Sequence, residues 1–155
     1  MNFRDDIGTS GRGAVLMPDR PASASAAAIR AAAVQTLSDA AGDERLSSRL
    51  AVVDATVAIE LRGHADATFA VRMEHGAIAI LDEGDPRSDI RLTMEALDLH
   101  ELFAGGLHLP MKIARGRVTY TGQVRRFLRV IAILAEMGQV YEHHLAEAQE
   151  REEGR

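Results

Sequence analysis

The stretch Ala55-Thr56-Val57-Ala58-Ile59-Glu60-Leu61-Arg62 decides the fold, because its larger apolar side chains fall on every second residue. Val57, Ile59 and Leu61 share one side of an extended chain, and the more polar residues between them share the other. This period of two is typical of a β-strand with one face exposed to water. Other segments of the chain must therefore cover the apolar face of the sheet to which this strand belongs.

The same alternation recurs further along the chain, between turn residues. It is found in residues 68–73, 77–81 and 89–94, and Gly63-His64 and Glu74-His75-Gly76 predict the tight turns of a meander. Residues 117–121 predict a last short strand with Val118 and Tyr120 on its apolar face. Together these segments predict a five-stranded, mostly antiparallel sheet.

Helical spacing of apolar residues predicts the layer that covers this sheet. The predicted helices span residues 21–41, 43–50 and 95–104, a short turn from Pro110, and one long helix from Gln123 to about Glu150. The fold class is therefore α+β, with helices on one face of the sheet. Beyond Gly138 only Tyr141 and Leu145 are large apolar anchors, so we expect this end of the last helix to open first, as a gate.

The length of 155 residues suits one domain. Residues 1–20 are rich in Gly, Ser, Asp and Arg and show no apolar periodicity, which predicts a disordered N-terminal arm. Residues 21–150 contain all the periodic segments and form the predicted domain.

Composition excludes several classes of function. The formal net charge of −5 argues against nucleic-acid binding, and the absence of cysteine removes a thiolate nucleophile and Cys-based zinc sites. No serine has a GxSxG context, and the adjacent His143 and His144 would point about 100° apart on a helix, as expected for a solvated helix face. We therefore expect no catalytic residue, no metal and no cofactor. No apolar run reaches the roughly 20 residues of a membrane span, and Asp5 and Asp6 do not suit a secretory signal, so we expect a cytoplasmic protein.

Several local motifs, in order, resemble the sterol carrier protein 2 (SCP2) family. They are Gly76-Ala77-Ile78-Ala79-Ile80, Ser88-Asp89-Ile90-Arg91-Leu92-Thr93-Met94, the helix with Asp98-Leu99 that ends in Leu102-Phe103-Ala104-Gly105, and Pro110-Met111-Lys112-Ile113-Ala114-Arg115-Gly116-Arg117-Val118 with Gly122. The resemblance covers residues 50–135. It implies a tunnel between sheet and helices that takes sterols, fatty acyl chains or other lipids, and binding or transfer without catalysis.

Apolar residues on the covered side of this pattern are the candidate lipid contacts. They are Leu99, Phe103, Leu107, Met111, Ile113, Val118, Tyr120, Phe127, Ile131 and Leu134. Tyr120 would either offer its hydroxyl to a ligand oxygen or be a core tyrosine with a bonded hydroxyl.

Other interpretations of the sequence stay open. The chain would be an enzyme, or an accessory subunit of one, if the tunnel holds an apolar intermediate such as a quinone or polyketide. It would be an interaction module if it forms a homodimer through the long last helix. Lys112 and the arginines between Arg115 and Arg129 would meet an anionic headgroup or a membrane surface, transiently, or form a solvated flank.

Overall fold

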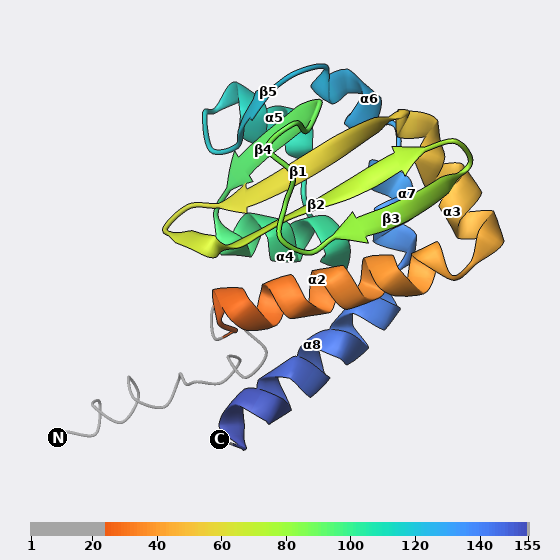
Figure 1. The fold of residues 1–155 in the computed structure, drawn as a ribbon. Helices are drawn as coiled ribbons and strands as arrows, with labels where there is room; N and C mark the ends of the chain where they lie inside the picture. The colour runs from red at the N-terminus through yellow and green to blue at the C-terminus, as the bar shows by residue number, and fades with distance from the viewer. Residues whose placement is uncertain (1–23, 155) are drawn as a thin grey trace, which may run out of the picture.

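A five-stranded sheet forms one layer of the molecule, and helices cover one of its faces (Figure 1). The structure is a computed structural model that describes residues 24–154, so the predicted arm at residues 1–20 lies outside the described residues. The elements in chain order are α2 (Ala26–Ala41), α3 (Glu44–Leu50), the 3-10 turn η3 (Ala51–Val53), β1 (Ala55–Leu61), β2 (His64–Glu74), β3 (Ala77–Leu81), β4 (Ile90–Met94), α4 (Ala96–Ala104), α5 (Leu109–Ala114), β5 (Thr119–Thr121), α6 (Val124–Leu128), α7 (Ile131–Glu136) and α8 (Gly138–Glu153). This confirms the predicted α+β class.

The strand order is β3-β2-β1-β4-β5, and every neighbouring pair is antiparallel except β1 and β4. The parallel pair arises because the chain leaves β3 at one edge and crosses the face of the sheet that carries none of the described helices before it enters β4 (Figure 1). Gly84 in this connection approaches the side chain of Thr68 on β2. The register places Val57 opposite both Val71 and Ile90, so apolar residues form continuous rows on the covered face.

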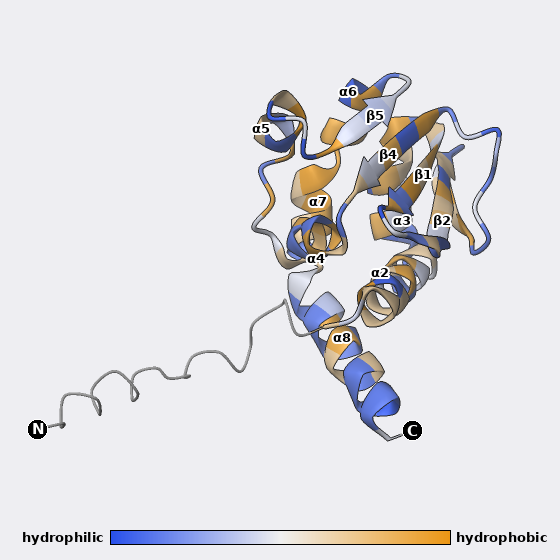
Figure 2. Ribbon diagram, turned by 90° about the vertical axis from the view of Figure 1, so that its left-hand side faces the viewer, coloured by the Kyte–Doolittle hydropathy of each residue, from blue (hydrophilic) through white to orange (hydrophobic). Residues whose placement is uncertain are grey.

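The helices α2 and α3 begin where the sequence supplies a capping side chain. The Ser25 hydroxyl accepts a hydrogen bond from the Ala28 N–H at the start of α2, and the Asp43 carboxylate accepts bonds from the Arg45 and Leu46 N–H groups at the start of α3. The helix α4 ends at Gly105, whose φ of 96° is accessible to glycine at little strain. Hydrophobic ribbon segments of α2, α4 and α7 face the sheet (Figure 2). The caps and the apolar faces thus act together to hold the helices on the sheet.

The predicted single helix from Gln123 to about Glu150 is wrong, because the chain forms three helices there. The first break is at Arg129 and Val130, and the second is at Met137, where φ is −94° and ψ is 13°. An unbroken helix of this length would extend about 42 Å and leave the domain. The breaks keep α6 and α7 over the sheet, while α8 turns away and packs along α2 (Figure 1).

Candidate functional site

The layer between sheet and helices encloses a small cavity that only apolar side chains line. Its volume is about 10 Å³, which is about the space of one water-sized sphere. The lining residues are Leu37, Val57, Ile59, Val71, Met73, Leu102, Phe103, Phe127 and Leu134. The interior is therefore closed in this structure.

Three groups of elements position this lining. The strands β1 and β2 form the floor through the inward-facing residues of their alternation. Leu37 on α2 and Leu102 and Phe103 on α4 form the walls. Phe127 on α6 and Leu134 on α7 complete the lining of the cavity. We call α6 and α7 together the cover.

The structure distributes the predicted lipid contacts over several places. Phe103, Phe127 and Leu134 line the cavity. Leu99, Leu107 and Val118 are buried elsewhere in the core, and Ile113 and Ile131 are half-buried. Met111 is 44% exposed. Contact of any of these residues with a lipid stays a prediction.

Tyr120 does not lie inside the enclosed space. Tyr120 pairs with the buried Leu92, so its side chain lies on the predicted apolar face of the sheet. The side chain is nevertheless 45% exposed. The reason is that β5 is a three-residue strand at the edge of the sheet. Tyr120 borders an open groove of about 290 Å³ with residues 122–125 instead. Its hydroxyl lies outside the cavity of this structure, and its contact with a ligand oxygen stays a prediction.

Sequence reasoning did not assign most of the lining. The unassigned residues are Leu37, Val57, Ile59, Val71, Met73 and Leu102. The signal that identifies the strand residues is the alternation itself, because it already places them on the covered face. The sequence therefore predicts that the residues of the cavity floor are buried. It does not predict how far the cavity extends between the sheet and the helices.

A buried ion pair fixes α5 against α4. The Asp98 side chain is only 2% exposed, and one of its oxygens lies 3.1 Å from Lys112 Nζ. Its other oxygen accepts a hydrogen bond from the Glu95 N–H. Lys112 also lies 3.6 Å from the Glu101 carboxylate. Lys112 is thus neutralised by two acids and holds the chain just before β5 in place.

A second polar contact lies behind the wall of the cavity. Tyr141 on α8 is fully buried, its ring stacks on Phe103 with centroids 5.4 Å apart, and its hydroxyl lies 3.0 Å from His100 Nδ1. Burial raises the pKa of Tyr141 and lowers the pKa of His100. Tyr141 therefore anchors α8 on α4, and the opening of this end of α8 before the rest of the domain stays a prediction.

The predicted solvated face for His144 is wrong. The His144 side chain is 16% exposed, and its Nε2 lies 2.7 Å from the Asp39 carboxylate on α2. The hydrogen bond from His144 lowers the pKa of Asp39. Tyr141, Leu145 and Ala148 on α8 are buried as well. One face of α8 therefore packs against the rest of the same chain. A homodimer through α8 would have to use its other, more polar face, and stays a prediction.

Among the described residues, no three His, Cys, Asp or Glu side chains gather as metal ligands. Within the same residues, no helix combines the length and the apolar character that a bilayer crossing requires.

The sequence model of a protein family described as the SCP-2 sterol transfer family matches residues 34–135, more than half of the chain. The chain belongs to the SCP-2 sterol transfer family. The predicted family resemblance is thereby confirmed. Every residue that lines the cavity lies within the matched range, whereas α8 lies outside it.

Solved structures of SCP-2 proteins show limited similarity to this chain. A crystal structure of sterol carrier protein 2 is 18% identical, with a TM-score of 0.48 over 74% of this chain and 93% of that chain. The apo form of sterol carrier protein 2 from Yarrowia lipolytica is 14% identical, with a TM-score of 0.48 over 72% and 88%. A protein described as UbiJ-SCP2, a ubiquinone synthesis protein, is 18% identical, with a TM-score of 0.47 over 61% and 80%. No curated protein matches the chain significantly.

Proposed function

We propose that this SCP-2 protein binds and transfers a single apolar lipid, which enters between the strands β1 and β2 and the cover. The observation that carries the proposal is the enclosed space itself, which has an entirely apolar lining in a member of a sterol transfer family. The lining offers no acid, base or nucleophile. The proposed role is therefore binding rather than catalysis.

Binding requires the cover to move, because the cavity of about 10 Å³ is far smaller than the roughly 300–1,000 Å³ of typical ligand pockets. The cover consists of helices of five and six residues, which are too short to be stable without packing. Apart from its cavity contact, α6 packs chiefly against η3, and Arg126 fixes it there through a 2.8 Å hydrogen bond to the Asp54 carbonyl. The walls are held more firmly than α6, since α2 packs extensively on α8 and α4 packs on α2, α7 and α8.

The energy needed for such binding is modest. A dissociation constant of 1 μM corresponds to about 8 kcal/mol. Burial of apolar surface contributes about 25 cal/mol per Å², so roughly 330 Å² of alkyl surface offsets that amount before the costs of immobilisation and of opening the cover. A sterol or a long acyl chain exceeds this area, whereas a short-chain acid does not.

A displacement assay tests the proposal. The purified protein is titrated with fluorescent sterol, fatty acid, acyl-CoA and quinone probes, and co-purified lipid is extracted and identified by mass spectrometry. We expect saturable binding of at least one long-chain probe with low micromolar affinity or better, and no binding of a short-chain analogue. Absence of saturable binding for every class of probe would refute the proposal. Selective binding of the quinone probe would support the alternative that the protein is an accessory subunit in the biosynthesis of a quinone.

A further inference from the structure

The basic residues of this acidic chain are distributed unevenly. Between Glu101 and Glu136, the 34 residues 102–135 contain six Lys or Arg residues and no Asp or Glu. The other 121 residues carry 12 of the 18 basic residues and all 23 acidic ones. A chain with a net charge of −5 thus contains one continuous segment of strongly positive charge.

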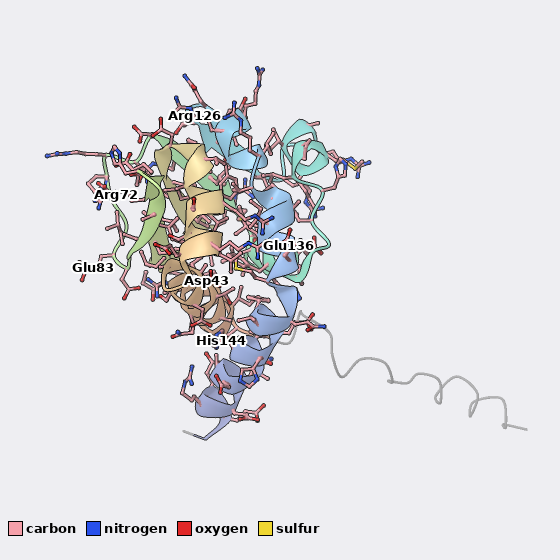
Figure 3. All side chains as sticks on the ribbon, turned by 90° about the vertical axis from the view of Figure 1, so that its right-hand side faces the viewer. Asp43, Arg72, Glu83, Arg126, Glu136 and His144 are labelled. Atoms are coloured by element: carbon pink, nitrogen blue, oxygen red, sulfur yellow. The ribbon has the colours of Figure 1, made fainter. Side chains whose placement is uncertain are left out.

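The fold gathers this charge at one end of the molecule. The elements α5, β5 and α6 lie together at the end opposite to the free end of α8, in both Figure 1 and Figure 2. Arg126 lies near the top of the view in Figure 3, and α8 with His144 extends towards the bottom. The helix α8 carries the acidic residues Glu142, Glu147, Glu150, Glu152 and Glu153. The protein therefore has a basic end, formed by residues 109–129, and an acidic end.

Most of the charge at the basic end is available to a partner. Arg115, Arg117, Arg125 and Arg129 are exposed, and no carboxylate of the described residues lies within 4 Å of their side-chain nitrogens. Arg126 is half-buried, donates to the Asp54 carbonyl and borders a pocket that Asp54 and Asp89 also line. Lys112 is neutralised by Asp98 and Glu101.

Exposed apolar side chains lie among these arginines. Met111 on α5 and Tyr120 on β5 are 44% and 45% exposed, and both belong to the small set of large apolar residues that the described chain exposes to water. An anionic bilayer accommodates both features, because arginines remain at the phosphates while methionine and tyrosine side chains enter the interface. A nucleic-acid backbone would match the arginines but would give Met111 no apolar partner.

We infer that the basic end docks the protein onto an anionic lipid membrane. The inference rests on the proposed function, since a lipid carrier must collect its ligand from a bilayer, and α6 of the cover lies within this end. The acidic remainder of the chain is repelled by the same surface, so the charge distribution favours one orientation, with the cover towards the lipid. Docking is reversible, because the apolar contribution is limited to a few side chains.

Vesicle flotation tests the inference with the full chain, using phosphatidylcholine vesicles with and without 30 mol% phosphatidylglycerol. We expect binding to the anionic vesicles only, and a steep loss of binding as sodium chloride rises from about 50 to 300 mM. The double variant Arg115→Gln/Arg117→Gln, whose residues lie outside the cover, should bind roughly 25-fold more weakly, since each basic residue near an anionic surface contributes about fivefold. The matched control Arg87→Gln/Arg151→Gln changes the net charge equally outside the segment and should bind nearly as the parent does.

The variant Met111→Ser/Tyr120→Ser tests the apolar contribution and should remove the binding that persists at high salt. Equal binding to neutral vesicles, an equal loss in the control variant, or tighter binding to DNA than to vesicles would overturn the inference. Probe binding without vesicles is measured on every variant. It should be unchanged in the arginine variants, so failure to bind probe would refute the proposed function alone, and failure to bind vesicles would refute the docking alone.

Discussion

Replacement of Phe127 by alanine separates stability from ligand binding. Phe127 is 1% exposed and contributes the ring with which α6 closes the cavity. Its truncation removes buried apolar surface and leaves a void, and such changes cost about 3–5 kcal/mol. For a chain of this length we expect the melting temperature to fall by roughly 10 °C.

The same substitution should strengthen binding of an apolar probe. The parent protein must displace the Phe127 ring before a ligand can occupy a space of about 10 Å³, whereas the variant already contains an apolar void beside it. Enclosed apolar voids stay dry and accept apolar molecules. The variant does not have to displace this ring. If that saves about 1.4 kcal/mol of binding free energy, the variant should bind the probe ten times more tightly than the parent protein.

Phe69→Ala is the matched control, because Phe69 is equally buried on β2 and does not line the cavity. Thermal melts and probe titrations are measured for the parent and for both variants, and saturating probe should raise the melting temperature most in Phe127→Ala. If both variants lost stability and Phe127→Ala bound probe no more tightly than Phe69→Ala, the ligand would not occupy the space beneath α6.

Three other predictions concern the polar contacts that hold the walls. Tyr141→Phe keeps the stacking on Phe103 but removes the hydroxyl near His100, so chemical denaturation should show a loss of about 1 kcal/mol. Burial lowers the pKa of His100 below its usual 6.5, so the folded state favours the neutral ring. The contribution of His100 to the free energy of unfolding should be complete above pH 6.5 and should decrease as the pH falls below it. In melting curves recorded over a series of pH values, His100→Gln should weaken this pH dependence. Lys112→Met leaves the Asp98 carboxylate buried without its partner, and urea titrations should show a loss of about 3 kcal/mol, which Asp98→Asn in the same chain partly restores.

The strands were predictable from the sequence, but one of their pairings was not. Alternation within residues 55–61 and 89–94 depends only on which side of the strand is covered, and it is a local property. The parallel pairing of β1 with β4 depends on where the connection after β3 runs, and the turn residues of that connection fit several routes. Hairpin turns specify their own antiparallel partners, so local signals determined the pairings of β1 with β2 and of β2 with β3.

The division of the last helix was not predictable for a related reason. The buried residues Phe127, Val130, Leu134, Met137 and Tyr141 follow one another at intervals of three and four residues across both breaks. An unbroken helix and three consecutive helices that turn around a domain produce the same sequence pattern. Only Gly138 marks a junction, and an alanine Cβ there would lie 3.3 Å from the Phe103 carbonyl oxygen.

This division also determines which side of the cavity can open. The helix α8 supports the wall from behind, because Tyr141 stacks on Phe103 and His144 binds Asp39 on α2. No such support is provided for α6, which packs chiefly on η3 among the described elements. Displacing a wall would separate α8 from the core and expose several buried side chains, whereas displacing α6 exposes chiefly Phe127, whose ring a bound lipid would cover again. The free energy of opening is therefore smallest at the cover, and an SCP-2 ligand in this protein should be exchanged through α6 rather than through the C-terminal helix.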